Sequence, residues 1–234
     1  MIGILVATKN EAYFFLRYLT PVKKEGIYHY RGAIDGKKIA LYLTRPGIAA
    51  KEQLRRFLRL YSWQKIISTG ACANLTSALK QRDVVRIGTA KAISKPTLFI
   101  PHGEYTVVSA PVLVTDDSTK ADIYRRTQAD VLDMETYAIA AILSESEFNK
   151  IPWCAVRVVD DTPGEEKYLY KERMLREMTV RTLSGRLKWR DIWAFGLWDY
   201  FRITTRRHRI AKAIFTVSIC EGRRRPNLSK ISRF

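Results

Sequence analysis

The most constraining feature of this sequence is an apolar helical pattern followed by a β-branched run that ends in two carboxylates. In residues 131–143 the apolar side chains recur at i, i+3, i+4, i+7 and i+8 from Met134, the stripe of an amphipathic helix. Asp133 and Glu135 would lie in its first turn, where the helix dipole favours negative charge. The run Trp153–Asp161 then predicts a buried parallel strand.

Asp160 and Asp161 close this strand and precede a Thr-Pro-Gly turn. In open α/β sheets, ligands bind at the carboxyl ends of the strands, so this position is a candidate site. From the residues alone, an N-cap turn and a solvated loop remain the other interpretation of these acids.

Strands and helices alternate along the first 170 residues. We expect strands at residues 2–7, 28–33, 38–44, 65–69, 83–87, 90–93 and 107–114, and helices at 10–18, 49–61 and 120–127. Asp35-Gly36 predicts a hairpin turn between the second and third strands. Alternation with short links implies an α/β fold with a mostly parallel sheet covered on both faces. A further helix is expected at residues 172–183.

The charge of the chain, +18 overall, is concentrated near its C-terminus. Residues 171–234 hold 17 Lys and Arg against 5 Asp and Glu, whereas residues 1–170 hold 24 against 18. The three cysteines form no CxxC pair and have no histidine at ligand spacing, so we expect a reducing compartment and no metal site. The N-terminal apolar run is too short for a signal peptide, and no span of about 20 apolar residues predicts a membrane helix. These features predict a cytoplasmic protein.

Four stretches of the chain, taken in order, resemble the purine nucleoside phosphorylase superfamily and within it the methylthioadenosine/S-adenosylhomocysteine nucleosidase branch. They are IGILVATKNEA, STGACANLTSALKQRDVVRIG, VLDMETYAIA and VRVVDDTP, and together they span about residues 2–165. The resemblance implies a three-layer α/β/α phosphorylase/hydrolase-like fold with a central mixed, mostly parallel twisted sheet. We assign this domain to residues 1–185. The composition of the remaining chain predicts a basic aromatic helical extension at 186–221 and a disordered basic tail at 222–234.

The resemblance also implies roles for individual residues in cleaving a purine N-glycosidic bond. Glu11 would activate the attacking water, Glu135 would accept hydrogen bonds from the ribose hydroxyls, and Met134 would pack against the sugar. Asp161 would protonate the departing base, helped by burial and by its acidic neighbour in the sequence. Arg157 would either orient one of these carboxylates or form a structural ion pair. The resemblance implies that no metal or organic cofactor is required. Because the family is usually dimeric or higher, we expect a homo-oligomer, most simply a dimer.

The loop after the fourth strand departs from the family pattern. Ala71-Cys72-Ala73-Asn74 stands where the family has Ser-Ala-Gly-Gly, and Ser68 stands where the phosphorylase branch has an arginine. Ala71 and Cys72 would therefore line the substrate without a hydroxyl. A phosphate dianion needs fixed donors or cations, so the loss favours hydrolysis, with phosphate as a co-substrate only in a phosphorylase. Arg45 is either a replacement cation or an ordinary surface arginine. Cys72 is expected to be a small buried residue rather than a nucleophile.

Other departures leave the substrate open. Asp160 stands where the family has serine, Thr119 falls loosely at the position of the base-stacking aromatic residue, and the segment 95–131 is short. A related nucleosidase-like branch that acts on adenosylhopane, a lipid-linked adenosine, has a similarly reduced segment. The alternatives to hydrolysis are therefore phosphorolysis, including that of a lipid-linked adenosine, and a catalytically silent protein that binds nucleoside, membrane or RNA.

The basic aromatic segment between Lys188 and Lys212 has three interpretations. It is a structural helix packed on the sheet, a helix on an anionic membrane surface, or a nucleic-acid contact. Because the chain contains no recognisable nucleic-acid motif, the third is the least favoured.

Overall fold

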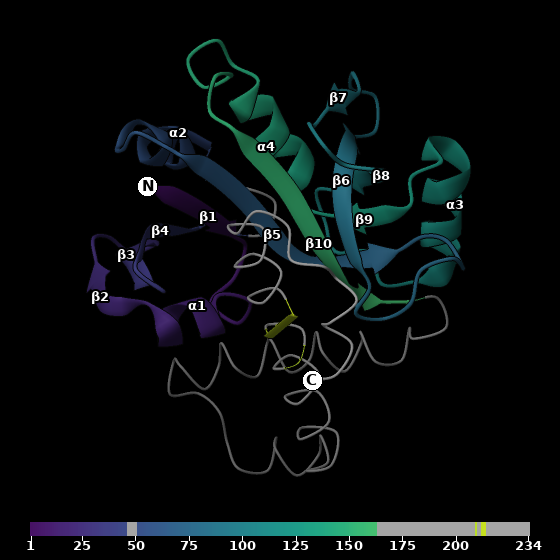
Figure 1. Ribbon diagram of the computed structural model, residues 1–234. Helices are drawn as coiled ribbons and strands as arrows, with labels where there is room; N and C mark the ends of the chain where they lie inside the picture. The colour runs from purple at the N-terminus through teal and green to yellow at the C-terminus, as the bar shows by residue number, and fades with distance from the viewer. Residues whose placement is uncertain (46–50, 163–208, 210–211, 214–234) are drawn as a thin grey trace, which may run out of the picture.

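The computed structural model describes residues 1–45, 51–162, 209 and 212–213 (Figure 1). The predicted helix at 172–183, the basic aromatic segment apart from Arg209 and Lys212, and the predicted domain boundaries after 185 and 221 lie outside the described residues.

Ten strands and four helices make up the described chain. The strands are β1 (Ile2–Val6), β2 (Thr20–Lys24), β3 (His29–Ile34), β4 (Lys37–Leu43), β5 (Lys65–Asn74), β6 (Val84–Lys91), β7 (Leu98–Phe99), β8 (Tyr105–Ser109), β9 (Val131–Asp133) and β10 (Trp153–Asp161). The helices are α1 (Tyr13–Tyr18), α2 (Lys51–Arg59), α3 (Asp117–Thr127) and α4 (Thr136–Leu143). None of these helices is long and apolar enough to cross a membrane.

All strands belong to one mixed sheet, which confirms the predicted α/β class. β10 pairs with both β6 and β5, so the strands β5, β9, β8, β6 and β10 close into a ring, and β1, β4, β3 and β2 extend from β5. Pairings at the centre, β4–β1, β1–β5 and β5–β10, are parallel. The carboxyl ends of β1, β5 and β10 therefore meet at one edge of the sheet.

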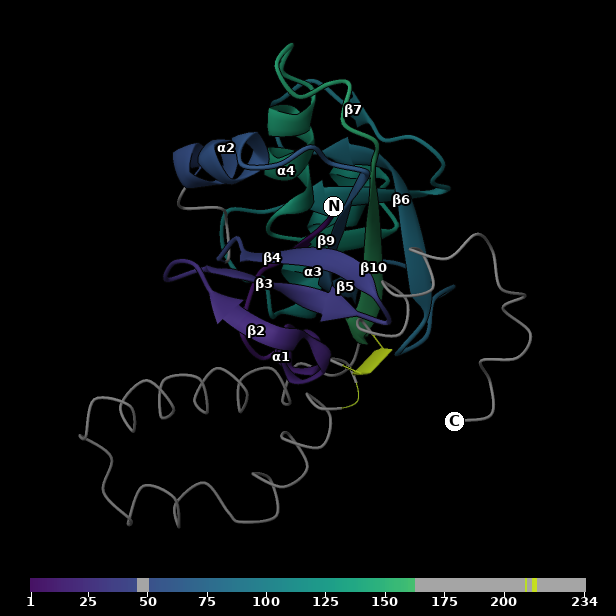
Figure 2. The same ribbon diagram turned by 60° about the vertical axis from the view of Figure 1, so that its left-hand side comes forward.

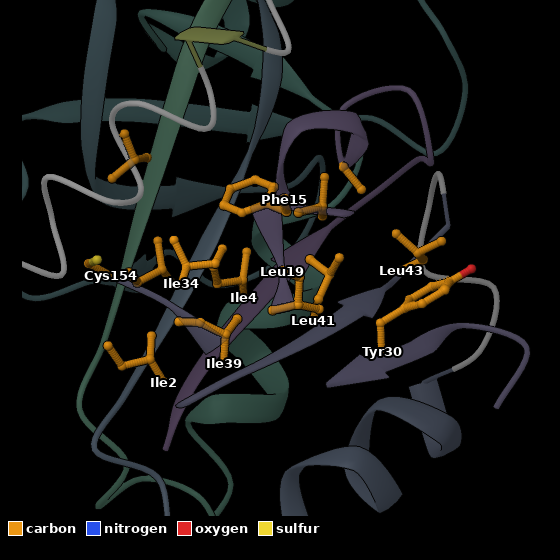
Figure 3. Packing of buried hydrophobic residues seen from close by; sticks show 14 of the residues in the cluster. Ile2, Ile4, Phe15, Leu19, Tyr30, Ile34, Ile39, Leu41, Leu43 and Cys154 are labelled. Atoms are coloured by element: carbon orange, nitrogen blue, oxygen red, sulfur yellow. The ribbon is translucent and has the colours of Figure 1, made fainter. Parts of the chain in front are cut away.

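Helices cover both faces of the central strands (Figures 1 and 2). α2 and α4 pack on one face against Leu5 and Ile66, and α1 packs on the other. Figure 3 shows this second cluster, in which Phe15 of α1 lies over Ile4 and Leu41. α3 packs through Ile123 beside β8 and β9. Because helices pack on both faces of the central strands, the candidate site lies at the carboxyl ends of β1, β5 and β10.

The central stretch 131–143 differs from the predicted helix. Its first residues form strand β9, which pairs with β5 and β8, and helix α4 starts only at Thr136. Asp133 explains the division, because its carboxylate accepts hydrogen bonds from the backbone N–H and the hydroxyl of Thr136. Met134 and Glu135 thus form a link between strand and helix rather than a first helical turn, so the helical prediction for residues 131–135 was wrong.

Several other boundaries also moved. β5 continues through Asn74, where a loop was expected after residue 69, and the predicted strands 83–87 and 90–93 are the single strand β6. α1 begins at Tyr13 instead of residue 10, and β8 occupies Tyr105–Ser109 where 107–114 was expected. The edge strands β2 and β7 were missed. The Asp35-Gly36 hairpin and β10 were predicted correctly.

Candidate active site

Glu11 lies in the link between β1 and α1 and is fixed by three hydrogen bonds. Its Oε1 accepts from the backbone N–H of Ala71 at 2.9 Å, and its Oε2 accepts from the backbone N–H and the hydroxyl of Thr8, both at 2.9 Å. Gly70 makes room for this contact, because a Cβ there would lie 3.0 Å from Oε1. The carboxylate is thereby held where β1 and β5 end side by side.

The Met134–Glu135 link returns along the same edge. Leu132 pairs with Ala73 in the antiparallel β5–β9 ladder, so the chain runs back along β5 before α4 begins. Glu135 is the N-cap residue of α4 and is 9% exposed, whereas Met134 is partly exposed. Met134 and Glu135, the two residues predicted to bind ribose, therefore follow β9 toward the part of β5 whose Ala71 binds Glu11.

Arg157 forms a buried network behind this link. Its Nε donates to Asp133 Oδ2 at 2.9 Å, and its Nη2 donates to the hydroxyls of Thr136 at 2.7 Å and Ser68 at 3.1 Å. Burial disfavours its charge, but the charges of Asp133 and Glu135 outweigh burial and raise the pKa of Arg157. Arg157 thus forms a structural ion pair with Asp133, and its hydrogen bond to Thr136 fixes the start of α4.

Asp161, the predicted general acid, is paired with a lysine that the sequence analysis did not select. Lys120 Nζ lies 2.7 Å from Asp161 Oδ2 and 3.4 Å from Asp117 Oδ1. Both Lys120 and Asp161 are buried. An adjacent ammonium favours the carboxylate and so opposes the effect expected from burial and from Asp160. One feature of the sequence could have indicated the burial of Lys120. It precedes apolar Ile123 by three residues, so both side chains lie on one face of α3.

Ala71 and Cys72 have different positions in the site. Ala71 contributes its backbone N–H to Glu11. Cys72 lies inside the strand ring with Val85 and Val159, and burial raises the pKa of its thiol. Cys72 is therefore a small core residue, as interpreted from the sequence, and its thiolate is disfavoured as a nucleophile.

Two further candidates, Arg45 and Thr119, are exposed. Arg45 is exposed and stacks over the ring of Tyr28 at 5.6 Å. Thr119 is exposed and donates its backbone N–H to Asp116, the N-cap of α3. Within the described residues, no group of three or more His, Cys, Asp or Glu side chains is placed to hold a metal ion.

A family model provides the decisive comparison. The model of the phosphorylase superfamily matches residues 89–187, a stretch that contains Met134, Glu135, Arg157 and Asp161. The resemblance to the phosphorylase superfamily is confirmed. Among curated proteins, none matches the chain in sequence.

Solved structures of nucleosidases share the fold. A mutant Helicobacter pylori 5′-methylthioadenosine/S-adenosylhomocysteine nucleosidase with 5′-methylthioadenosine in its active site has a TM-score of 0.65 at 15% identity, covering 93% of this chain and 97% of its own. The Neisseria meningitidis enzyme with methylthio-immucillin-A has a TM-score of 0.58 at 19% identity, covering 68% and 85%. A mutant futalosine hydrolase of H. pylori has a TM-score of 0.58 at 15% identity, covering 80% and 99%. At these identities the likeness establishes the superfamily fold.

Proposed function

We propose that the protein hydrolyses the N-glycosidic bond of an adenosine-type purine nucleoside and releases the free base. The observation that carries this proposal is the anchoring of Glu11. Three hydrogen bonds from Thr8 and Ala71 hold its carboxylate at the strand ends. A fixed carboxylate in this position is suited to accept a proton from a water molecule that attacks C1′ of the ribose.

The other strand-end residues supply the remaining roles. Glu135 accepts hydrogen bonds from the ribose hydroxyls, and Met134 packs against the apolar side of the sugar. Asp161 donates a proton to the departing base, because cleavage leaves negative charge on the purine. Placement of the three residues on the β9–α4 link and on β10 supports this division of roles.

The cations beside the site favour water over phosphate as the nucleophile. Arg157 is ion-paired with Asp133 and Lys120 with Asp161, both in buried surroundings. A phosphate dianion would require donors or cations that are not already bound to carboxylates. Ser68, at the position of the phosphorylase arginine, instead accepts a hydrogen bond from Arg157.

The solved structures of similar fold support the purine class of substrate. Two of those structures contain methylthio-immucillin-A and 5′-methylthioadenosine, respectively. From these ligands we propose that the substrate of this chain is also an adenosine-type nucleoside.

Base release from a panel of adenosine derivatives, with and without phosphate, tests the proposal. The panel includes 5′-methylthioadenosine, S-adenosylhomocysteine, adenosine and a lipid-linked adenosine. We expect adenine and a free sugar to form from at least one derivative at a rate that phosphate leaves unchanged. Formation of a sugar 1-phosphate would replace hydrolysis with phosphorolysis. If none of the substrates releases adenine, the site is silent, and steeply salt-dependent RNA binding would then favour a binding protein.

Replacing Glu135 with glutamine tests the ribose contact. The amide keeps the size of the side chain but loses the charge that both ribose hydroxyls would contact. Hydrogen bonds to charged groups contribute about 1.5–3 kcal/mol, so we expect kcat/KM to fall by about 10- to 100-fold, with a raised KM. Glu104→Gln, at an exposed glutamate, is the matched control. An unchanged KM for Glu135→Gln would remove Glu135 from the ribose site.

Three predictions about the whole chain remain predictions. They are homodimer formation, a cytoplasmic location, and peripheral membrane contact through the segment between Lys188 and Lys212.

A further inference from the structure

The pairing of Lys120 with Asp161 is the least expected feature of the candidate site. The Lys120 side chain is 3% exposed and that of Asp161 is 8% exposed, and their charged atoms lie 2.7 Å apart. Lysine is almost never fully buried unless it is paired, because an ammonium loses its hydration on burial. This pair connects α3 to the end of β10, two elements that are separated by the 25 residues 128–152.

The backbone that carries Lys120 is itself fixed. Asp116 caps α3 by accepting a hydrogen bond from Thr119 N at 2.7 Å, and hydrogen bonds from Thr119 and Ser118 lower the pKa of Asp116 to about 2. Ile123, one turn further along, packs into the core beside β8 and β9. A capped and packed helix therefore holds the ammonium in place against Asp161.

We propose that Lys120 is a positioning residue that orients the Asp161 carboxyl group and stabilises the carboxylate left after proton transfer to the departing base. This proposal rests on the proposed function. In the step concerned, the electron pair of the glycosidic bond goes to the purine, and the proton of Asp161 goes to a purine nitrogen. The oxygen of water bonds to C1′, and its proton goes to Glu11. The ion pair engages Oδ2 of Asp161, so Oδ1 is the oxygen assigned to the transfer.

The surroundings of the pair set the direction of the effect. Asp117 of α3 lies 3.4 Å from Lys120 Nζ, and Asp160 directly precedes Asp161 on β10. The negative charges of these two aspartates favour a protonated Asp161, whereas Lys120 favours the carboxylate. Removing the ammonium should therefore let Asp161 keep its proton to higher pH and should make it a weaker proton donor.

Lys120→Met is the main test, measured as the pH profile of kcat/KM for adenine release. An opposite charge at this distance changes a carboxyl titration by about 1 to 3 pH units, so the basic limb of the profile should move up by that amount. With a Brønsted coefficient of about 0.5, the rate on the plateau should fall by about 3- to 30-fold. Lys120→Arg keeps the charge and should leave the limb in place.

Lys91→Met is the matched control. Lys91 Nζ donates to the carbonyl oxygen of Thr127 at 2.6 Å, at the far end of the same helix. It tests whether loosening α3 alone is sufficient to produce the effect. A purely structural role for Lys120 would lower activity equally at all pH values, without moving the limb.

Titration of the Asp161 carboxyl carbon by ¹³C NMR provides a readout that does not require activity. The signal is assigned from its loss in Asp161→Asn. We expect the titration midpoint to rise by about 1 to 3 pH units in Lys120→Met, and equally in Lys120→Gln should the methionine variant not fold. A midpoint that stays unchanged would overturn the inference. The Asp161 midpoint could rise in Lys120→Met although the wild-type protein releases no base. The proposed function would then be wrong, while the effect of Lys120 on Asp161 would be confirmed.

Discussion

Replacing Glu11 with glutamine is expected to lower kcat for adenine release by about 10²- to 10⁴-fold, the usual contribution of a general base. The amide oxygen can still accept the hydrogen bond from Ala71 or from Thr8, so the side chain stays near its present place. An amide cannot take a proton from water at neutral pH. The base acts on water and not on the nucleoside, so its interaction is made only in the transition state. We therefore expect KM to change by less than about threefold.

Glu104→Gln is again the matched control, since this exposed glutamate lies just before β8. Both variants should unfold at nearly the same urea concentration as the wild type. The measurement is steady-state adenine release, with adenine binding by calorimetry as a separate readout. Retention of more than a tenth of the wild-type kcat in Glu11→Gln would mean that another group activates the water.

Local sequence patterns were sufficient for the central strands. The run Trp153–Asp161 is β-branched and ends in polar residues, and the structure has β10 with the same limits. The Asp35-Gly36 turn likewise predicted the β3–β4 hairpin, since few residues other than glycine adopt its left-handed backbone conformation readily. These predictions succeeded because the signals for start, stop and burial lie within the segment itself.

The β9–α4 junction could not be predicted in the same way. Val131 and Leu132 fit an apolar stripe of a helix as well as a short buried strand. The decision depends on Asp133, whose carboxylate binds Thr136 locally and Arg157 twenty-four residues later. A contact at that separation leaves no periodic signal, so the start of α4 was placed too early.

Lys120 was missed for a related reason. A lysine three residues after the helix N-terminus is ordinarily solvated, and nothing nearby in the sequence indicates its partner. The partner, Asp161, reaches it only because the strand ring brings β10 close to α3. The family resemblance selected Asp161 but had no position for this lysine. Residues that act through long-range contacts thus required the structure.

Arg157→Met is expected to lower the free energy of unfolding by about 3–5 kcal/mol, the usual cost of removing one partner of a buried ion pair. The Arg157 side chain is 2% exposed and that of Asp133 is 0% exposed, so the remaining carboxylate would have no access to water. Urea unfolding followed by tryptophan fluorescence measures the loss.

A second substitution separates the lost charge pair from the lost packing. In Arg157→Met with Asp133→Asn, the neutral amide still accepts from Thr136, and we expect part of the stability to return. Arg55→Met is the control, because Arg55 forms its ion pair with Glu145 at the surface, where solvent screening makes such pairs weak. If Arg157→Met were no less stable than Arg55→Met, the network would not hold the start of α4. Glu135 would then depend on some other contact for its place at the site.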